Sequence, residues 1–386
     1  MKPFQTMPCR VKSYEAALNG YEKTDTYLIA YNDICNGGEN ILTPAGYTDY
    51  VGSFLYIPFF SDLMNIDIDT ITILFYSLYG ILCILISVIG LFKFYNTKPA
   101  LIHGTISILG VGTICILISD TYSFYGLTSL ALITWWSKIH IIVQNHRKFI
   151  IFIILTGFLI GFSNTVRGNS GTDVLISIIC VLIFNCFVNR NFSKLYIIIL
   201  ILLPVIIINF QISVLKNKSK NYLETNTEVN KSHDLNFVRA IWHNAYYGLG
   251  YLSINNKDVP EPSDVYSTKR AIEIKSDVII YSKEYENILM NEYFKFIKKY
   301  PFLYLKIILS KTGVVIFYFL IFFNIGIYYL LKNKIKSETL IFFGTGVMIN
   351  SLFGIAAEPD YTYLLGLFAY SSLLGTKLIE DKYSKV

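Results

Sequence analysis

Two acidic side chains in this sequence have the chemistry to act on a hydroxyl group. Asp25 stands in the run Thr-Asp-Thr-Tyr-Leu-Ile-Ala-Tyr, where apolar neighbours could keep the pKa of a carboxylate near the working pH of a general base. An Asp before an apolar run is also a favoured helix N-cap, and the spacing alone favours that role. Asp120, in Ile-Ser-Asp-Thr-Tyr, could bind an acceptor together with Tyr122 or cap a helix.

Arg167 is a candidate for binding a phosphate group. It stands in Asn-Thr-Val-Arg-Gly-Asn-Ser-Gly. The planar guanidinium matches phosphate oxygens, and the neighbouring glycines let a ligand approach the backbone. The alternative is that Arg167 only extends its charged end from apolar surroundings to water. The sequence leaves both interpretations open.

The segment from Arg239 to Tyr251 carries the strongest local signal. It reads Arg-Ala-Ile-Trp-His-Asn-Ala-Tyr-Tyr-Gly-Leu-Gly-Tyr. Trp242 and Tyr247 could stack on sugar rings, while Arg239 and His243 could hold a phosphate group. The alternative is a structural aromatic turn that packs against the rest of the chain.

Most familiar metal, nucleotide and hydrolase motifs are missing from the sequence. It contains no Walker loop, no Gly-x-Ser-x-Gly elbow and no Cys-x-x-Cys pair among its 6 Cys residues. Asp67-Ile-Asp69 resembles the Asp-x-Asp pair that holds a metal ion in some soluble enzymes, but it directly precedes an apolar stretch, which favours capping. We therefore expect no metal site, and the sequence indicates no cofactor, although a divalent metal requirement stays open.

The composition is that of a membrane protein. Of the 386 residues, 53% are hydrophobic and only 16% are charged, and the mean hydropathy is +0.48. Soluble domains carry about 25% charged residues. A membrane-spanning helix needs about 20 mostly apolar residues, and about nine stretches qualify or nearly qualify, which predicts an all-α multi-pass membrane protein. The predicted spans are Thr70–Leu91, Ala100–Ser119, Phe124–Ile142, Phe149–Phe162, Val174–Val188, Leu195–Leu215, Thr312–Leu331, Thr339–Ala356 and Tyr361–Gly375.

The distribution of Lys and Arg predicts the orientation. Cytoplasmic loops are enriched in these residues, and here they fall almost entirely in alternate connections between the predicted spans. The remaining short connections, which contain Asp120 and Glu358–Asp360, hold Arg167 as their one positive residue. We therefore expect a plasma-membrane protein with a cytoplasmic C-terminus and an extracytoplasmic site. The net charge of +6 is explained by this pattern without nucleic acid. The first set contains Lys93, Lys98, Lys138, Arg147, Lys148, Arg190, Lys194, Lys332, Lys334, Lys336, Lys377, Lys382 and Lys385.

Two long segments are predicted to lie outside the membrane. Residues 1–69 and 216–311 flank the first six spans at 70–215, and residues 312–386 hold the last three spans and a cytoplasmic tail. This orientation places Met1 outside without a signal peptide. We expect either a first span that inserts as a reverse anchor or a further helix ahead of Met1, and we favour the further helix.

Two shorter segments are predicted to lie along the membrane rather than cross it. Val51–Phe60 is apolar but too short to span, and it contains Pro58, so we expect an interfacial or re-entrant piece. Within Lys283–Lys299, apolar residues recur at helical spacing between charges, which predicts an amphipathic helix on the membrane surface. Pro301 is expected to end that helix.

These features together resemble the polytopic glycosyltransferases of the C superfold (GT-C), in particular the family-39-like enzymes that use a polyprenyl-phosphate sugar. The resemblance is diffuse but covers most of the chain. It rests on Asp25-Thr-Tyr27 with Ala30 and Gly37-Gly38, on the Gly46 to Pro58 segment, on Trp242 to Tyr251, and on Ile297 to Pro301 with Tyr304-Leu-Lys306. That family often has two adjacent acidic residues at the first motif, whereas this chain has Thr24-Asp25.

The resemblance implies an inverting glycosyl transfer at the outer membrane face. Asp25 would deprotonate an acceptor hydroxyl, which would attack the anomeric carbon of the donor and release polyprenyl phosphate. Arg167, Arg239 and His243 would offset the charge of the leaving group. In the family the catalytic acid lies just after a first helix, which here would precede Met1. The partners implied are a polyprenyl-phosphate-linked sugar and membrane lipid.

Two other functions compete with this interpretation. An O-antigen polymerase or ligase also has many spans and a large outer loop, and the ten residues between Arg239 and Gly250 resemble an Arg-x10-Gly pattern of polymerases. A non-catalytic transporter or flippase would have charged residues inside its spans. The predicted spans hold almost none, which favours an enzyme.

Overall fold

The computed structural model describes residues 31–32, 42–43, 51–118, 120–225, 241–253, 259–280, 282–332 and 334–384. Within these residues the chain is almost entirely helical, with one antiparallel pairing between the two-residue strands β1 and β2. In chain order the elements are β1 (Tyr31–Asn32), β2 (Leu42–Thr43), α2 (Val51–Met64), α3 (Ile68–Phe94), α4 (Lys98–Ile118), α5 (Ser123–Trp136), α6 (Ile139–Gln144), α7 (His146–Val166), α8 (Thr172–Asn189), η3 (Ser193–Leu195), α9 (Tyr196–Thr225), α10 (Ile241–Tyr247), η4 (Gly248–Leu252), α11 (Asp264–Ile274), α12 (Lys283–Lys299), α13 (Pro301–Phe323), α14 (Gly326–Lys332), α15 (Ser337–Ala356), η5 (Tyr361–Leu364) and α16 (Leu365–Tyr383).

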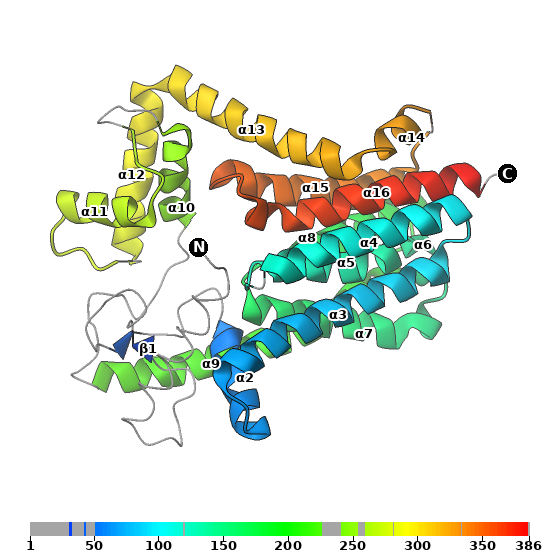
Figure 1. Ribbon diagram of the computed structural model, residues 1–386, viewed down its shortest axis with the longest axis horizontal. Helices are drawn as coiled ribbons and strands as arrows, with labels where there is room; N and C mark the ends of the chain where they lie inside the picture. The colour runs from blue at the N-terminus through cyan, green and yellow to red at the C-terminus, as the bar shows by residue number, and fades with distance from the viewer. Residues whose placement is uncertain are drawn as a thin grey trace.

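Eight helical segments of the described chain are long and apolar enough to cross a membrane, which confirms an all-α multi-pass membrane protein (Figure 1). They are formed by α3, α4, α7, α8, η3 with the first part of α9, α13, α15, and η5 with α16. The predicted number of about nine needs one correction. The stretch Phe124–Ile142 is not a single long helix, because the chain breaks at Ser137 and Lys138 between α5 and α6.

The helix predicted at Thr312–Leu331 is also displaced. Helix α13 begins at Pro301, which occupies its first turn, and ends at Phe323. Asn324 follows with a positive φ of 35° and separates α13 from α14. A helix can start with Pro because its missing N–H has no intrahelical acceptor there. The spanning helix therefore starts at Pro301, well before the predicted start at Thr312.

Helix α5 lies in the centre of the bundle and is covered on nearly all sides. Of its 14 residues, 12 are buried, and it packs against α3 and α16. Small residues permit this close packing, as at Gly126, where an added Cβ would lie 2.5 Å from Cys115 Sγ. Helix α16 is buried to a similar extent, while the other spans present many large apolar side chains on the outside.

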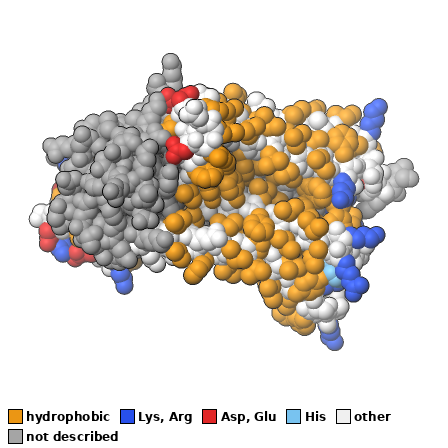
Figure 2. Space-filling model, turned by 90° about the horizontal axis from the view of Figure 1, so that it is seen from below, with side chains coloured by type: hydrophobic (Ala, Val, Ile, Leu, Met, Phe, Trp, Pro, Cys, Tyr) orange, Lys and Arg blue, Asp and Glu red, His pale blue; other side chains and the backbone are white. Residues whose placement is uncertain are grey.

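The bundle has two chemically different ends. Lys and Arg side chains gather at one end of the apolar surface (Figure 2). We call this the basic end; it contains Lys93, Lys138, Arg190 and Lys382, as the pattern of charged loops predicts. The opposite end, which we call the loop end, carries Asp120, Arg167 and the connection from α15 to η5. The assignment of the basic end to the cytoplasm stays a prediction.

Helices α10, η4, α11 and α12 form a small helical unit beyond the loop end (Figure 1). Helix α12 has the predicted bounds, Lys283–Lys299, and Pro301 follows it as expected. Protein covers part of the predicted apolar face of α12. Tyr285, Leu289 and Phe296 on α12 are buried in a second core together with Tyr246 and Ala271 of the unit, whereas Phe294 is 46% exposed. A position on the membrane surface stays a prediction.

Helix α2 packs beside the loop end of α7. The Tyr56 ring stacks on Phe162 with 5.0 Å between centroids, and its hydroxyl lies 3.0 Å from Thr165 Oγ1. Gly52 permits the approach, because a Cβ there would lie 2.6 Å from Thr165 Oγ1. At 14 residues α2 is not among the segments long enough to span, as predicted for Val51–Phe60.

Candidate functional site

Arg167 is buried at the loop end of the bundle against two tyrosine rings. It follows the last residue of α7, and its backbone N–H donates to Ser163 O at 2.8 Å. Its guanidinium carbon lies 4.0 Å from the centre of the Tyr122 ring, and its Nε donates to the Tyr125 hydroxyl at 3.3 Å. Only 7% of the residue is exposed. This burial argues against the alternative interpretation, in which Arg167 extends its charged end into water.

The tyrosines that hold Arg167 are themselves linked. The Tyr122 hydroxyl lies 3.2 Å from the Tyr363 hydroxyl, and the two rings meet edge to face with 5.1 Å between centroids. Tyr125 donates its hydroxyl hydrogen to Gly168 O at 3.0 Å. We call Tyr122, Tyr125, Arg167 and Tyr363 the arginine–tyrosine cluster. It joins residues from three separate connections at the loop end.

A buried carboxylate lies directly behind this cluster. Asp173, in the first turn of α8, accepts hydrogen bonds from Ser129 Oγ at 2.6 Å and Asn350 Nδ2 at 2.9 Å. Ser129 Oγ also lies 2.9 Å from Tyr125 O, which links the two groups. The helix N-terminus favours the negative charge, and both hydrogen bonds compensate part of its burial. We call Ser129, Asp173 and Asn350 the Asp173 network.

The sequence interpretation missed Asp173 because it lies one residue ahead of the predicted span Val174–Val188. The signal was available in its partners. Ser129 and Asn350 are polar residues well inside two predicted apolar stretches. The predicted spans hold almost no charged residues, but the spanning helices start earlier than predicted and therefore include the buried Asp173 (5% exposed) and Lys311 (2% exposed).

The connection from α15 to η5 joins the cluster to the small helical unit. At one end, Tyr363 reaches Tyr122, and at the other, the Tyr247 hydroxyl donates to Glu358. Burial, and next the negative charge of Asp360, raise the pKa of the Glu358 carboxyl above its ordinary value. Tyr247 and Tyr122 therefore both contact the segment from Glu358 to Tyr363, although neither belongs to it.

Lys311 fixes this connection to the bundle. Its ammonium donates to Ala357 O at 2.6 Å and to Ile355 O at 3.3 Å, at the C-terminus of α15. A cation is favourable at that end of a helix. Gly248 lies directly beside it, because a Cβ there would be 2.8 Å from Lys311 Nζ and 2.2 Å from Ala357 O. Glycine is therefore needed where the small helical unit meets the bundle.

His243 lies in the core of the small helical unit instead of the cluster. It is 2% exposed, and its Nδ1 is 2.6 Å from the Tyr285 hydroxyl. The Glu286 carboxylate accepts from the backbone N–H groups of Trp242 at 2.7 Å and His243 at 3.2 Å, which satisfies the start of α10. The Trp242 ring packs on Tyr293 with 5.6 Å between centroids. These contacts favour the structural interpretation of Trp242 and His243.

The acidic candidates have separate outcomes. Asp120 accepts from the N–H of Thr121 at 2.5 Å, a contact within its own turn. Asp67 caps α3 by accepting from Thr70 N at 2.9 Å, which confirms the capping interpretation. Asp25 and Arg239 lie outside the described residues. Among the residues that the structure does describe, no group of His, Cys, Asp and Glu is arranged to hold a metal ion.

A cavity of about 190 Å³ lies in the small helical unit. Tyr246, Tyr266, Arg270 and Glu292 contribute to its wall. Arg270 is engaged there, because its Nη2 donates to Glu292 at 2.7 Å and its Nε at 3.1 Å. Its charge is therefore compensated within the wall, which weakens the case for an anion site.

Neither a protein-family model, nor a curated protein, nor a solved structure matches this chain.

Proposed function

We propose that this chain is an integral membrane glycosyltransferase. It transfers a sugar from a polyprenyl-phosphate donor to an acceptor at the loop end of the bundle, in the assembly of a surface glycan or glycolipid. The observation that carries the proposal is the burial of Arg167 on the Tyr122 ring at that end. A positive group fixed at the membrane boundary suits a ligand whose lipid lies in the bilayer and whose phosphate lies at the interface.

The surroundings of Arg167 fit such a donor. Stacking on a tyrosine face fixes the plane of a guanidinium, which keeps its positive charge in a defined position at the loop end. Tyr122 and Tyr363 present hydroxyl groups and ring edges at the same place. The outer surface of the bundle is apolar along its length, which accommodates a polyprenyl chain (Figure 2).

The proposed reaction is an inverting substitution at the anomeric carbon. Asp25 accepts the proton of the acceptor hydroxyl, and the hydroxyl oxygen forms the new bond to that carbon. The bond from the carbon to the phosphate oxygen breaks, and the electron pair leaves with polyprenyl phosphate. Arg167 stabilises the charge that develops on this leaving group, a role worth about 10²- to 10³-fold in rate for one donor group.

Arg167→Gln tests the proposal. The full chain in vesicles is given a panel of polyprenyl-phosphate sugars, and release of polyprenyl phosphate is measured. We expect turnover to fall about 100-fold or more in the variant, since Gln lacks the positive charge. Lys334→Gln at the basic end is the matched control and should keep full turnover. Equal turnover in Arg167→Gln and the wild type would refute the role of Arg167.

Asp25→Asn separates the two enzyme classes. It should abolish transfer in a GT-C-like enzyme, whereas an O-antigen polymerase or ligase would be little affected.

The Asp173 network supports transport as a second candidate function. An ionisable residue inside the membrane commonly marks the path of a substrate or proton, and Asp173 is 5% exposed with Ser129 and Asn350 bound to it. Asp173→Asn keeps the shape and removes the carboxylate. For a transporter we expect this variant to abolish movement of polyprenyl-linked sugar across vesicles. For an enzyme the variant should retain transfer within about threefold, with Ser177→Ala as a control at a neighbouring hydroxyl.

A further inference from the structure

A second candidate site lies at the basic end, the opposite end of the bundle from Arg167 and Tyr122. A cavity of about 160 Å³ opens there between α6, α8, η3 and the start of α15. A single water needs only about 10–15 Å³ of such space, so the cavity can hold a larger group. Its wall is unusually rich in polar side chains, which include His140, Gln144, Asn185, Lys194 and Glu338.

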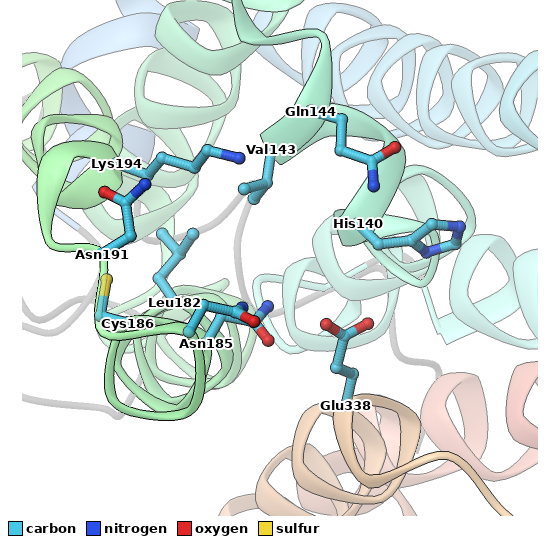
Figure 3. Close-up of a pocket in the computed structure, with 10 residues that line it drawn as sticks. His140, Val143, Gln144, Leu182, Asn185, Cys186, Asn191, Lys194 and Glu338 are labelled. Atoms are coloured by element: carbon cyan, nitrogen blue, oxygen red, sulfur yellow. The ribbon is translucent and has the colours of Figure 1, made fainter.

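Two opposite charges face this cavity without neutralising each other. The Glu338 carboxylate lies on one side next to His140, and the Lys194 ammonium reaches in from the other side (Figure 3). Neither charged group makes a hydrogen bond or ion pair with any residue that the structure describes. Burial lowers the pKa of His140, which favours its uncharged form. The cavity therefore presents one cation and one anion.

Amide groups add both donors and acceptors between these charges. Asn185 and Gln144 point into the same space (Figure 3), and neither amide has a hydrogen-bond partner among the described residues. The cavity wall therefore offers hydrogen-bond donors, acceptors and both charges, which suits a ligand with a cationic donor group and an anionic acceptor group.

Two exposed aromatic side chains are next in sequence to residues that line the cavity. Phe187 and Phe192 pack edge to face with 5.8 Å between ring centroids, and they are 68% and 55% exposed. They follow the lining residues Cys186 and Asn191 directly. Pockets between membrane helices that carry basic side chains bind the phosphate groups of lipids.

We propose that this cavity binds the head group of a zwitterionic phospholipid that carries a primary ammonium and a phosphate, as phosphatidylethanolamine does. The ligand phosphate accepts from Lys194 and the amides, and the ligand ammonium donates to Glu338. An anionic lipid without an amine would leave Glu338 unpaired. A trimethylated amine could not donate hydrogen bonds to it.

Lipid titration of the purified full chain tests the proposal. Phosphatidylethanolamine, phosphatidylcholine and phosphatidylglycerol with identical acyl chains are added in detergent, and bound lipid is counted by native mass spectrometry. We expect phosphatidylethanolamine to bind about tenfold tighter than the other two, the effect of one charge-assisted hydrogen bond. Equal affinity for the three lipids would overturn the proposal.

Two variants assign the two charges. Glu338→Gln should remove the preference for phosphatidylethanolamine over phosphatidylcholine. Lys194→Gln should weaken the binding of all three lipids about tenfold. Lys334→Gln, at the same end but outside the cavity, is the control and should bind as the wild type does. Unchanged binding in Lys194→Gln would contradict the site. Displacement of the lipid by an equal concentration of soluble phosphoethanolamine would overturn the assignment to a lipid.

Discussion

At the scale of single residues, the site depends on how a buried guanidinium is kept in place. A buried charge is costly unless other groups compensate it. The Tyr122 and Tyr125 rings lie 4.0 Å and 5.6 Å from the Arg167 guanidinium carbon, and Tyr125 also accepts a hydrogen bond from it. These aromatic faces compensate part of the cost of burying the guanidinium and hold it in one orientation.

Replacing Tyr122 separates the ring from its hydroxyl. Tyr122→Phe keeps the face under Arg167 and loses only the contact with Tyr363, so we expect it to lower the free energy of unfolding by less than about 1.5 kcal/mol. Tyr122→Leu removes the face, which should cost about 0.5–2 kcal/mol more and should also weaken the binding of polyprenyl phosphate. Thermal unfolding in detergent and lipid binding measure the two effects. If the Leu and Phe variants behave alike, the ring does not hold Arg167.

The sequence was sufficient for single residues only where a residue broke a local rule. Arg167 was found because it is the one positive residue in a set of short loops that otherwise lack Lys and Arg. Tyr363 and Asp173 were missed because their importance comes from contacts with Tyr122 and Asn350, far away in the chain. His243 had two interpretations in sequence, since an aromatic cluster rich in Gly is also typical of a packed turn. Only tertiary contacts distinguish them.

At the scale of elements, hydropathy and periodicity located most helices but not what covers them. The bounds of α12 followed from apolar residues at helical spacing and from Pro301. The same pattern is produced by a face on lipid and by a face on other helices, so its true partners, α10 and α11, could not be inferred. The break between α5 and α6 was hidden, because Ser137 and Lys138 interrupt an apolar run only briefly.

Close approach between α7 and α9 gives a test at this scale. An added Cβ at Gly157 would lie 2.2 Å from Ile201 O, so Gly157→Ala forces the helices apart. We expect a loss of about 1–3 kcal/mol in the free energy of unfolding. Gly313→Ala on α13 is the matched control, because nothing lies within 4 Å of its added Cβ, and it should change stability by less than about 0.5 kcal/mol. Equal unfolding temperatures for both variants would contradict this packing.

At the scale of the whole molecule, the alternation of charged loops predicted which connections share an end. The structure agrees, since Lys and Arg gather at the basic end (Figure 2). The orientation is testable with reporters. A fusion after Lys148 or Lys336 should report a cytoplasmic position, and a fusion near Asn230 an external one. An external signal at Lys336 would reverse the orientation and place the arginine–tyrosine cluster inside the cell.

The shortness of the central helix has a consequence for the strength of the site. Fourteen helical residues extend about 21 Å, whereas the hydrocarbon layer is about 30 Å thick. Neighbouring helices surround α5 and separate it from lipid, so it does not have to cross the whole bilayer. A helix of this length leaves at least one of its ends below the bilayer surface. Tyr122 immediately precedes the first residue of α5. Arg167, beside Tyr122, is only 7% exposed, so a phosphate bound to it would meet its charge in a medium of lower dielectric than water, where attraction between opposite charges is several times stronger.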